Sequence, residues 1–99
     1  MQKIDEVLEQ LKKMKPQALI LFGSAARGEM KKDSDVDILM VKEMKESFSD
    51  RMRIIRSSLR TNLPLDLLVL TPKEAREIPK KSQFFLEIFD EGKYVYGKI

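Results

Sequence analysis

Three apolar runs of strand length dominate this chain, and two of them carry aspartates. The runs lie at residues 17–22, 35–41 and 63–70. The second run opens with Asp35 and Asp37, and the third is apolar throughout except for Asp66. An unpaired carboxylate in a buried strand is costly, so Asp66 needs a metal ion, a cation or a hydrogen-bond network. If these two runs form neighbouring strands, all three carboxylates converge on one face of a sheet.

The segments between the runs have the spacing of helices. Residues 2–14 and 45–61 repeat apolar side chains every three or four residues, and each predicts an amphipathic helix. The stripe of the second helix consists of Phe48, Met52, Ile55 and Leu59. Shorter helices are expected at 24–29, after Thr71 with a capping box, and after Ser82, with a short edge strand at 94–96. The order predicts a single α/β domain over residues 1–99, with helices on one side of the sheet.

The spacing of Asp35 and Asp37 favours a cation site. Side chains alternate along a strand, so these carboxylates point to the same face, roughly 6–7 Å apart. At an effective dielectric constant near 20 they repel by about 2–3 kcal/mol, which a divalent metal ion reverses. Upstream, Ser24 is a suitable N-cap for the helix after Gly23, and a helix N-terminus favours phosphate. Metal carboxylates beside a phosphate site indicate nucleotide chemistry.

The composition excludes several kinds of chemistry. The chain has neither cysteine nor histidine, so disulfides, thiolate catalysis, histidine bases and histidine zinc sites are excluded. The net charge of +3 is weak evidence for a nucleic-acid partner. Arg53, Arg56 and Arg60 form a stripe that reads as a solvated helix face, or else as a contact with an acidic partner or RNA. No signal-peptide core or membrane-length run occurs, so we expect a cytoplasmic protein without membrane contact.

A family resemblance follows from the spacing of these motifs. Gly23-Ser24, a gap of ten residues and then Asp35-Val36-Asp37 resemble the signature of the DNA polymerase beta nucleotidyltransferase superfamily. The fuller run, GSAARGEMKKDSDVDILMV, is most similar to its minimal nucleotidyltransferases, the MNT group that includes the MntA-like antitoxins. The resemblance covers nearly the whole chain. It implies the nucleotidyltransferase fold, a small mixed sheet with helices packed on one face.

The resemblance also implies a reaction and its carboxylates. Members of this superfamily transfer a nucleoside monophosphate, usually AMP from ATP, to a hydroxyl group with two magnesium ions. On this basis Asp35 and Asp37 bind the metal ions. Asp66 completes the triad, as a metal ligand and as the base for the attacking hydroxyl.

Other positions match the part of the family motif that contacts phosphate. Gly23 and Ser24 are expected to hold the β- and γ-phosphates, and Arg27 matches a frequent family arginine that touches phosphate. Ser34 is expected to shape the loop before the aspartate pair. Ala25 departs from the family pattern, in which many members have a bulky or basic residue, and this leaves one triphosphate contact in doubt.

Three functions remain open from the sequence. The resemblance favours an antitoxin that adds AMP to a tyrosine of a HEPN-domain toxin, with the partner or a second copy completing the site. The second reading is a binding module that blocks such a partner by contact alone. The third is transfer to a small molecule, as in the aminoglycoside nucleotidyltransferases.

Overall fold

A computed structural model of the chain describes residues 3–29 and 35–99. The loop role expected for Ser34 therefore falls outside the described residues. The elements follow one another as α1 (Lys3–Lys12), β1 (Ala18–Phe22), α2 (Gly23–Ala26), β2 (Val36–Val41), α3 (Phe48–Ser57), β3 (Leu65–Leu70), α4 (Pro72–Glu77), the 3₁₀ turn η1 (Ile78–Lys80), α5 (Gln83–Glu91) and β4 (Lys93–Gly97). All three apolar runs are strands, as their composition predicts.

The four described strands form one mixed sheet in the order β3-β2-β1-β4. β1 pairs antiparallel with both β2 and β4, whereas β2 and β3 are parallel and are connected through α3. The strand of Asp37 and the strand of Asp66 are therefore neighbours, and the expected short edge strand near residues 94–96 is β4. This confirms an α/β fold built on a small mixed sheet.

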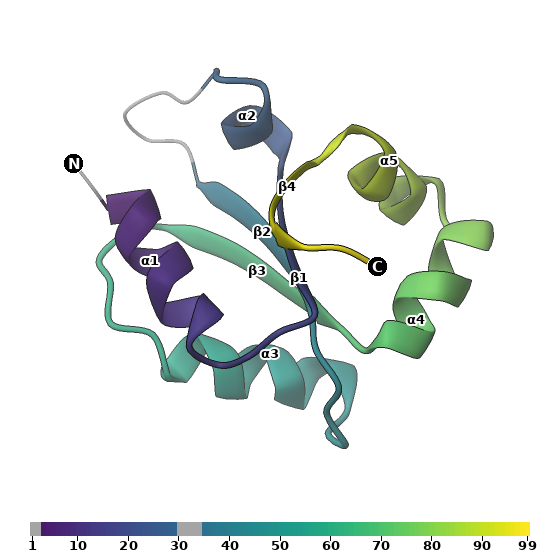
Figure 1. Ribbon diagram of the computed structural model, residues 1–99, viewed down its shortest axis with the longest axis horizontal. Coiled ribbons are helices and arrows are strands. Elements are labelled where there is room, and N and C mark those ends of the chain that lie inside the picture. Colours follow the sequence, from purple (N-terminus) through teal and green to yellow (C-terminus); the bar gives the residue numbers. More distant parts are fainter. Residues whose placement is uncertain (1–2, 30–34) are drawn as a thin grey trace.

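One face of the sheet is covered by α1 and α3 (Figure 1). Alternate residues of β1, β2 and β3 point to this face and are buried with apolar residues of both helices. The buried members are Val7, Leu8 and Leu11 of α1, Leu19, Leu21, Val36, Ile38, Met40, Leu67 and Val69 of the strands, Ile55 of α3, and Leu59 just after it. This layer explains the amphipathic patterns of both long helices, with one exception. Phe48, expected in the buried stripe of α3, is exposed at the first residue of that helix.

The other face is covered as well, so the expectation that helices pack on one face only is wrong. The intervening strand residues on that face, such as Ile20, Leu39 and Val41, are also apolar and fully buried. Ala75 of α4 and Ile88 of α5 pack against them, as Figure 1 shows in the placement of α4 and α5 across the sheet from α1 and α3. Strands with apolar residues on both sides require cover on both sides.

Capping residues set where most of the helices begin. The Ser47 hydroxyl accepts a hydrogen bond from the Asp50 backbone amide at 3.4 Å, so α3 begins at Phe48 and is shorter than the predicted 45–61. Thr71 forms the predicted capping box with Glu74, and the Ser82 hydroxyl caps α5 as expected. These local signals were readable because each depends on side chains within three residues.

The prediction that Ser24 is the N-cap of α2 is wrong, because the observed N-cap lies two positions earlier. This helix has only four residues and begins at Gly23, with Phe22 as its N-cap, so Ser24 is its second residue. The physical reason is the backbone of Gly23, whose φ of +65° turns the chain sharply off β1.

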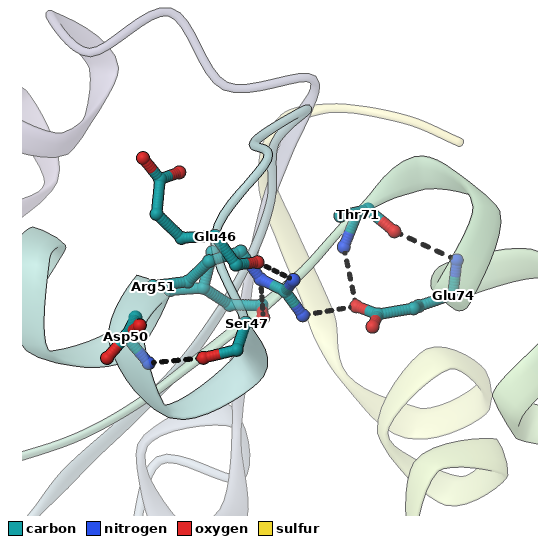
Figure 2. A network of polar contacts seen from close by, with 7 residues as sticks. Glu46, Ser47, Asp50, Arg51, Thr71 and Glu74 are labelled. Atoms are coloured by element: carbon teal, nitrogen blue, oxygen red, sulfur yellow. Dashed lines mark hydrogen bonds and ion pairs between the residues drawn. The ribbon is translucent and has the colours of Figure 1, made fainter.

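Arg51 is a buried charged residue that connects three segments (Figure 2). Its guanidinium donates to the Val69 carbonyl of β3 at 3.2 Å, to the Glu46 carbonyl before α3 at 2.7 Å, and to the Glu74 carboxylate of α4. Burial disfavours the charged form of Glu74, but hydrogen bonds from Thr71 and Arg51 outweigh it and lower the pKa of Glu74. Arg51 therefore fixes α3 relative to β3 and α4.

We expect Arg51→Met to lower the free energy of unfolding by about 2–4 kcal/mol, because two carbonyls and a carboxylate lose their donor. Urea unfolding followed by circular dichroism measures the change. The matched control is Arg53→Met, which removes an exposed guanidinium from the same helix and should leave the unfolding curve nearly unchanged. An Arg51→Met protein as stable as wild type would show that the contacts of Arg51 make no net contribution.

Among the residues described, none of the helices has the length and apolar character needed to cross a bilayer.

Candidate active site

Three side chains form a row across the sheet at the end where β1 turns into α2. The strand register pairs Phe22 of β1 with Asp37 of β2, and Asp37 with Asp66 of β3. Residues paired in register have side chains on the same face, here the face of α4 and α5. The Asp37 and Asp66 carboxylates are therefore neighbours, which the sequence left conditional on the pairing of their two strands.

The row forms part of the floor of a groove of about 730 Å³. Beside Phe22, at the β1 end, the ring of Phe84 from α5 also lines the groove. Beyond Asp66, at the outer edge of β3, Arg53 and Arg56 of α3 line it. The remaining lining is aliphatic and consists of Met52, Leu65, Leu67 and Leu68. The groove thus changes from aromatic to acidic to basic along the sheet.

The Asp37 carboxyl group is held where its charged form is disfavoured. Burial raises its pKa, and the negative charges of Asp66 and Asp35 raise it further, whereas the charge of Arg27 acts weakly in the opposite direction. Asp66 is close enough to share a hydrogen bond with a protonated Asp37. Two adjacent carboxylates in this state are the donor set that a divalent cation binds, because the cation replaces repulsion by attraction.

Gly23 gives the Asp37 carboxylate its space. A Cβ atom at position 23 would overlap the Oδ2 atom of Asp37 and would lie 3.2 Å from its Cγ atom. The positive φ of this residue also favours glycine over residues with a side chain. Gly23 of the Gly-Ser motif thus has a structural role at the site, because it allows the turn after β1 to contact the Asp37 carboxylate directly.

Asp35 is placed differently from the other two aspartates. It precedes β2 by one residue and is exposed, although its charge still acts on Asp37. In the part of the chain that is described, no group of three or more acidic side chains is close enough to hold a metal ion. The structure therefore brings Asp37 and Asp66 together, whereas Asp35 as a third ligand stays a prediction.

The residues expected at phosphate lie beside the row. Ser24 follows Gly23 in α2, and Arg27 is the C-terminal cap of this helix. The Arg27 Nε atom donates to Oε1 of Glu29 at 2.8 Å, and both side chains are exposed. Phosphate contacts by Gly23, Ser24 and Arg27 remain predictions, with Arg27 close enough for its charge to act on Asp37.

Sequence reasoning missed four of the groove residues. Arg53 and Arg56 form a stripe in the sequence, but nothing there indicates that they line the same groove as Asp37 and Asp66. Phe84 lies in an apolar stretch that is typical of a core helix, yet the residue is 56% exposed. Phe22 ends an apolar run, and only the strand register places it opposite Asp37.

The raised pKa of Asp37 has a consequence for stability. The folded protein holds this proton more tightly than the unfolded chain, so the contribution of Asp37 to stability is present at low pH and is lost as the pH rises through the raised pKa. In metal-free protein we expect Asp37→Asn to melt at a higher temperature than wild type at neutral pH. The difference should shrink as the pH approaches the ordinary value of 3.8.

Calorimetric melting curves in a chelating buffer, recorded from neutral pH down to about pH 4, measure this difference. Asp90→Asn is the matched control, since Asp90 is an exposed carboxylate of α5 that does not line the groove. A metal-free Asp37→Asn protein that is less stable than wild type at neutral pH would contradict the electrostatic account.

Comparison with known proteins identifies the family. Residues 1–96 match the family model of the nucleotidyltransferase domain. A curated relative is "Putative protein adenylyltransferase MJ0141" of Methanocaldococcus jannaschii, which is 44% identical over 52 residues. That match covers 52% of this chain and 52% of the relative, so it spans about half the length of each.

Solved structures have the same fold. The crystal structure of "a putative nucleotidyltransferase from Sulfolobus solfataricus" has a TM-score of 0.61 at 24% identity, covering 95% of this chain and 76% of that one. A toxin–antitoxin structure with AMP-PNP has a TM-score of 0.63 at 20% identity and 98% and 75% coverage. A mutant of the toxin–antitoxin MntA-HpeT has a TM-score of 0.60 at 17% identity, again with 98% and 75% coverage. With the family match over nearly the whole sequence, the chain belongs to the nucleotidyltransferase domain family.

Proposed function

We propose that this protein is a magnesium-dependent adenylyltransferase that transfers AMP from ATP to a hydroxyl of a partner protein, and that the partner is a HEPN-type toxin modified on a tyrosine. The observation that carries the proposal is the pairing of Asp37 with Asp66 beside Gly23 in an open groove. Membership in the nucleotidyltransferase domain family supports the type of reaction. The adenylyltransferase name of the relative and the toxin–antitoxin neighbours support the acceptor class.

The donor set fits a divalent cation. Asp37 and Asp66 are adjacent carboxylates. The pKa of Asp37 is raised first by burial and then by the negative charge of Asp66, and a cation would relieve this repulsion. We propose that these two residues and Asp35 hold two magnesium ions. Bound magnesium would supply positive charge against the triphosphate and the departing pyrophosphate.

Other residues of the chain then bind the triphosphate and accept the proton of the acceptor. The turn at Gly23 and Ser24 holds the β- and γ-phosphates, with Arg27 adding positive charge at their side. The acceptor hydroxyl enters from the β3 side, where Asp66 accepts its proton. The hydroxyl oxygen forms a bond to the α-phosphorus, the bond between this phosphorus and the bridging oxygen breaks, and pyrophosphate leaves with the electron pair.

A second candidate is an antitoxin that acts by contact alone. It is favoured by one observation: within residues 3–29 and 35–99 no three acidic side chains form a ready metal-binding group. In this case the paired carboxylates would be a remnant of the family site. The two candidates differ in whether the carboxylates are needed once the partner is bound.

Binding of ATP with magnesium should raise the melting temperature of the protein, because a ligand that binds only the folded state stabilises it by about 2.7 kcal/mol at a hundredfold excess over Kd. Asp37→Asn should abolish the rise, whereas Asp90→Asn should retain it. Thermal shift assays with magnesium alone, ATP alone and both together measure the effect. No rise with wild type and both ligands would contradict nucleotide binding.

Transfer itself is tested with the co-expressed partner and ATP labelled at the α-phosphate. Label should appear on the partner with wild type, and γ-labelled ATP should give none, because the γ-phosphate leaves in pyrophosphate. Asp66→Asn should reduce labelling at least a hundredfold while the two proteins still co-purify. If wild type and Asp66→Asn neutralise the toxin equally well and neither transfers label, the contact-only antitoxin is the correct reading.

A further inference from the structure

At the aromatic end of the groove, a large apolar side chain is exposed beside charged residues. The Phe84 side chain is 56% exposed at the beginning of α5. Its ring meets the ring of Phe22 edge to face, with centroids 6.3 Å apart, and meets Phe85 in the same manner at 5.1 Å. Phe85 packs against the core of this face, whereas Phe84 lines the groove. Its ring is therefore held in place from two sides while much of its surface stays open.

The position of Phe84 relative to the acidic row limits what can cover it. Phe22, which Phe84 touches, is the register partner of Asp37 and the residue directly before Gly23. The opposite end of the groove, at Asp66, is also lined by Arg53 and Arg56. The proposed function places the acceptor hydroxyl at this end. In-line transfer puts the departing pyrophosphate opposite the acceptor, over Gly23 and Ser24, and leaves the nucleoside to one side of the α-phosphate, within the same groove that the exposed ring of Phe84 lines.

We propose that Phe84 is the platform on which the nucleobase of the substrate stacks, and that it gives the site a preference for purine over pyrimidine triphosphates. This inference rests on the proposed nucleotidyl transfer and adds the base-binding residue to it. A flat aromatic ring with an open face gains from base stacking, and the gain is larger for the two-ring purines. Because stacking alone does not read the hydrogen-bonding edge of the base, ATP and GTP should bind more similarly to each other than either does to UTP.

The experiment uses a probe that the chain makes possible. The protein contains no tryptophan, so Phe84→Trp introduces a single tryptophan at the proposed platform, and its emission can be excited selectively at wavelengths that tyrosine does not absorb. With magnesium present, ATP should quench its emission and inorganic tripolyphosphate should not, although both ligands should raise the melting temperature. Leu86→Trp is the matched control, since Leu86 is an exposed residue of the same helix that does not line the groove. Its emission should not respond to ATP.

Removal of the ring provides the second arm. Phe84→Leu keeps an apolar side chain but has no flat face, so its Kd for ATP should rise roughly tenfold while its Kd for tripolyphosphate stays unchanged. Leu86→Ala should change neither constant. Both constants can be measured by isothermal calorimetry, and the melting temperature of each variant without ligand reports whether it is folded.

Each further outcome overturns a specific statement. If wild type binds neither ATP nor tripolyphosphate, both the proposed function and the platform are wrong. If it binds both ligands equally tightly, or if Phe84→Leu weakens both to the same degree, the platform is wrong and nucleotidyl transfer stands. If Phe84→Trp emission changes with protein concentration and not with ATP, the ring is a contact between copies of the chain.

Discussion

The site depends on a repulsive contact that the sheet enforces. β2 and β3 are parallel neighbours in a register that places the Asp37 and Asp66 carboxylates side by side, and burial raises the pKa of Asp37 further. A cross-strand pair of like charges opposes folding, so it persists only because the apolar residues on either side of it hold the two strands together. Val36, Ile38 and Leu67, which flank the pair, are each at least 92% buried. The stability of the strands thus keeps two carboxylates side by side in spite of their repulsion.

The other parts of the site are arranged around this pair of carboxylates. Gly23 has no side chain, so the turn after β1 can lie against the Asp37 carboxylate. α3 packs on the face of the sheet opposite to α4 and α5, and its Arg53 and Arg56 line the groove together with Asp37 and Asp66. The position of α3 depends in turn on Arg51, whose buried guanidinium joins β3, the segment before α3 and α4 (Figure 2). The buried Arg51 guanidinium therefore determines where Arg53 and Arg56 lie at the surface.

Much of the fold and the centre of the site could be predicted from the sequence, because the signals are local. Apolar runs predicted the strands, and Thr71 and Ser82 predicted two helix starts. The expectation that Asp66 needs a metal ion, a cation or a hydrogen-bond network assumed a buried carboxylate, whereas Asp66 is exposed at the groove. Features that depend on the packing of distant segments could not be predicted from such local patterns. The cover of the second sheet face by α4 and α5 and the exposure of Phe84 follow only from the complete fold. Arg51 is an intermediate case: a charged residue among the core-facing positions of α3 was visible in the pattern, but its three acceptors were not.

The place of β3 at the edge of the sheet has a consequence for how activity would be lost on heating. This strand has a single neighbour, β2, whereas β2 and β1 are hydrogen-bonded on both sides. Local opening that begins at an edge could separate Asp66 from Asp37 while the other strands remain paired. Thermal inactivation would then precede cooperative melting, and the amide protons of β3 would exchange with deuterium before those of β1. Equal protection of the two strands would show that the carboxylates separate only when the whole domain unfolds.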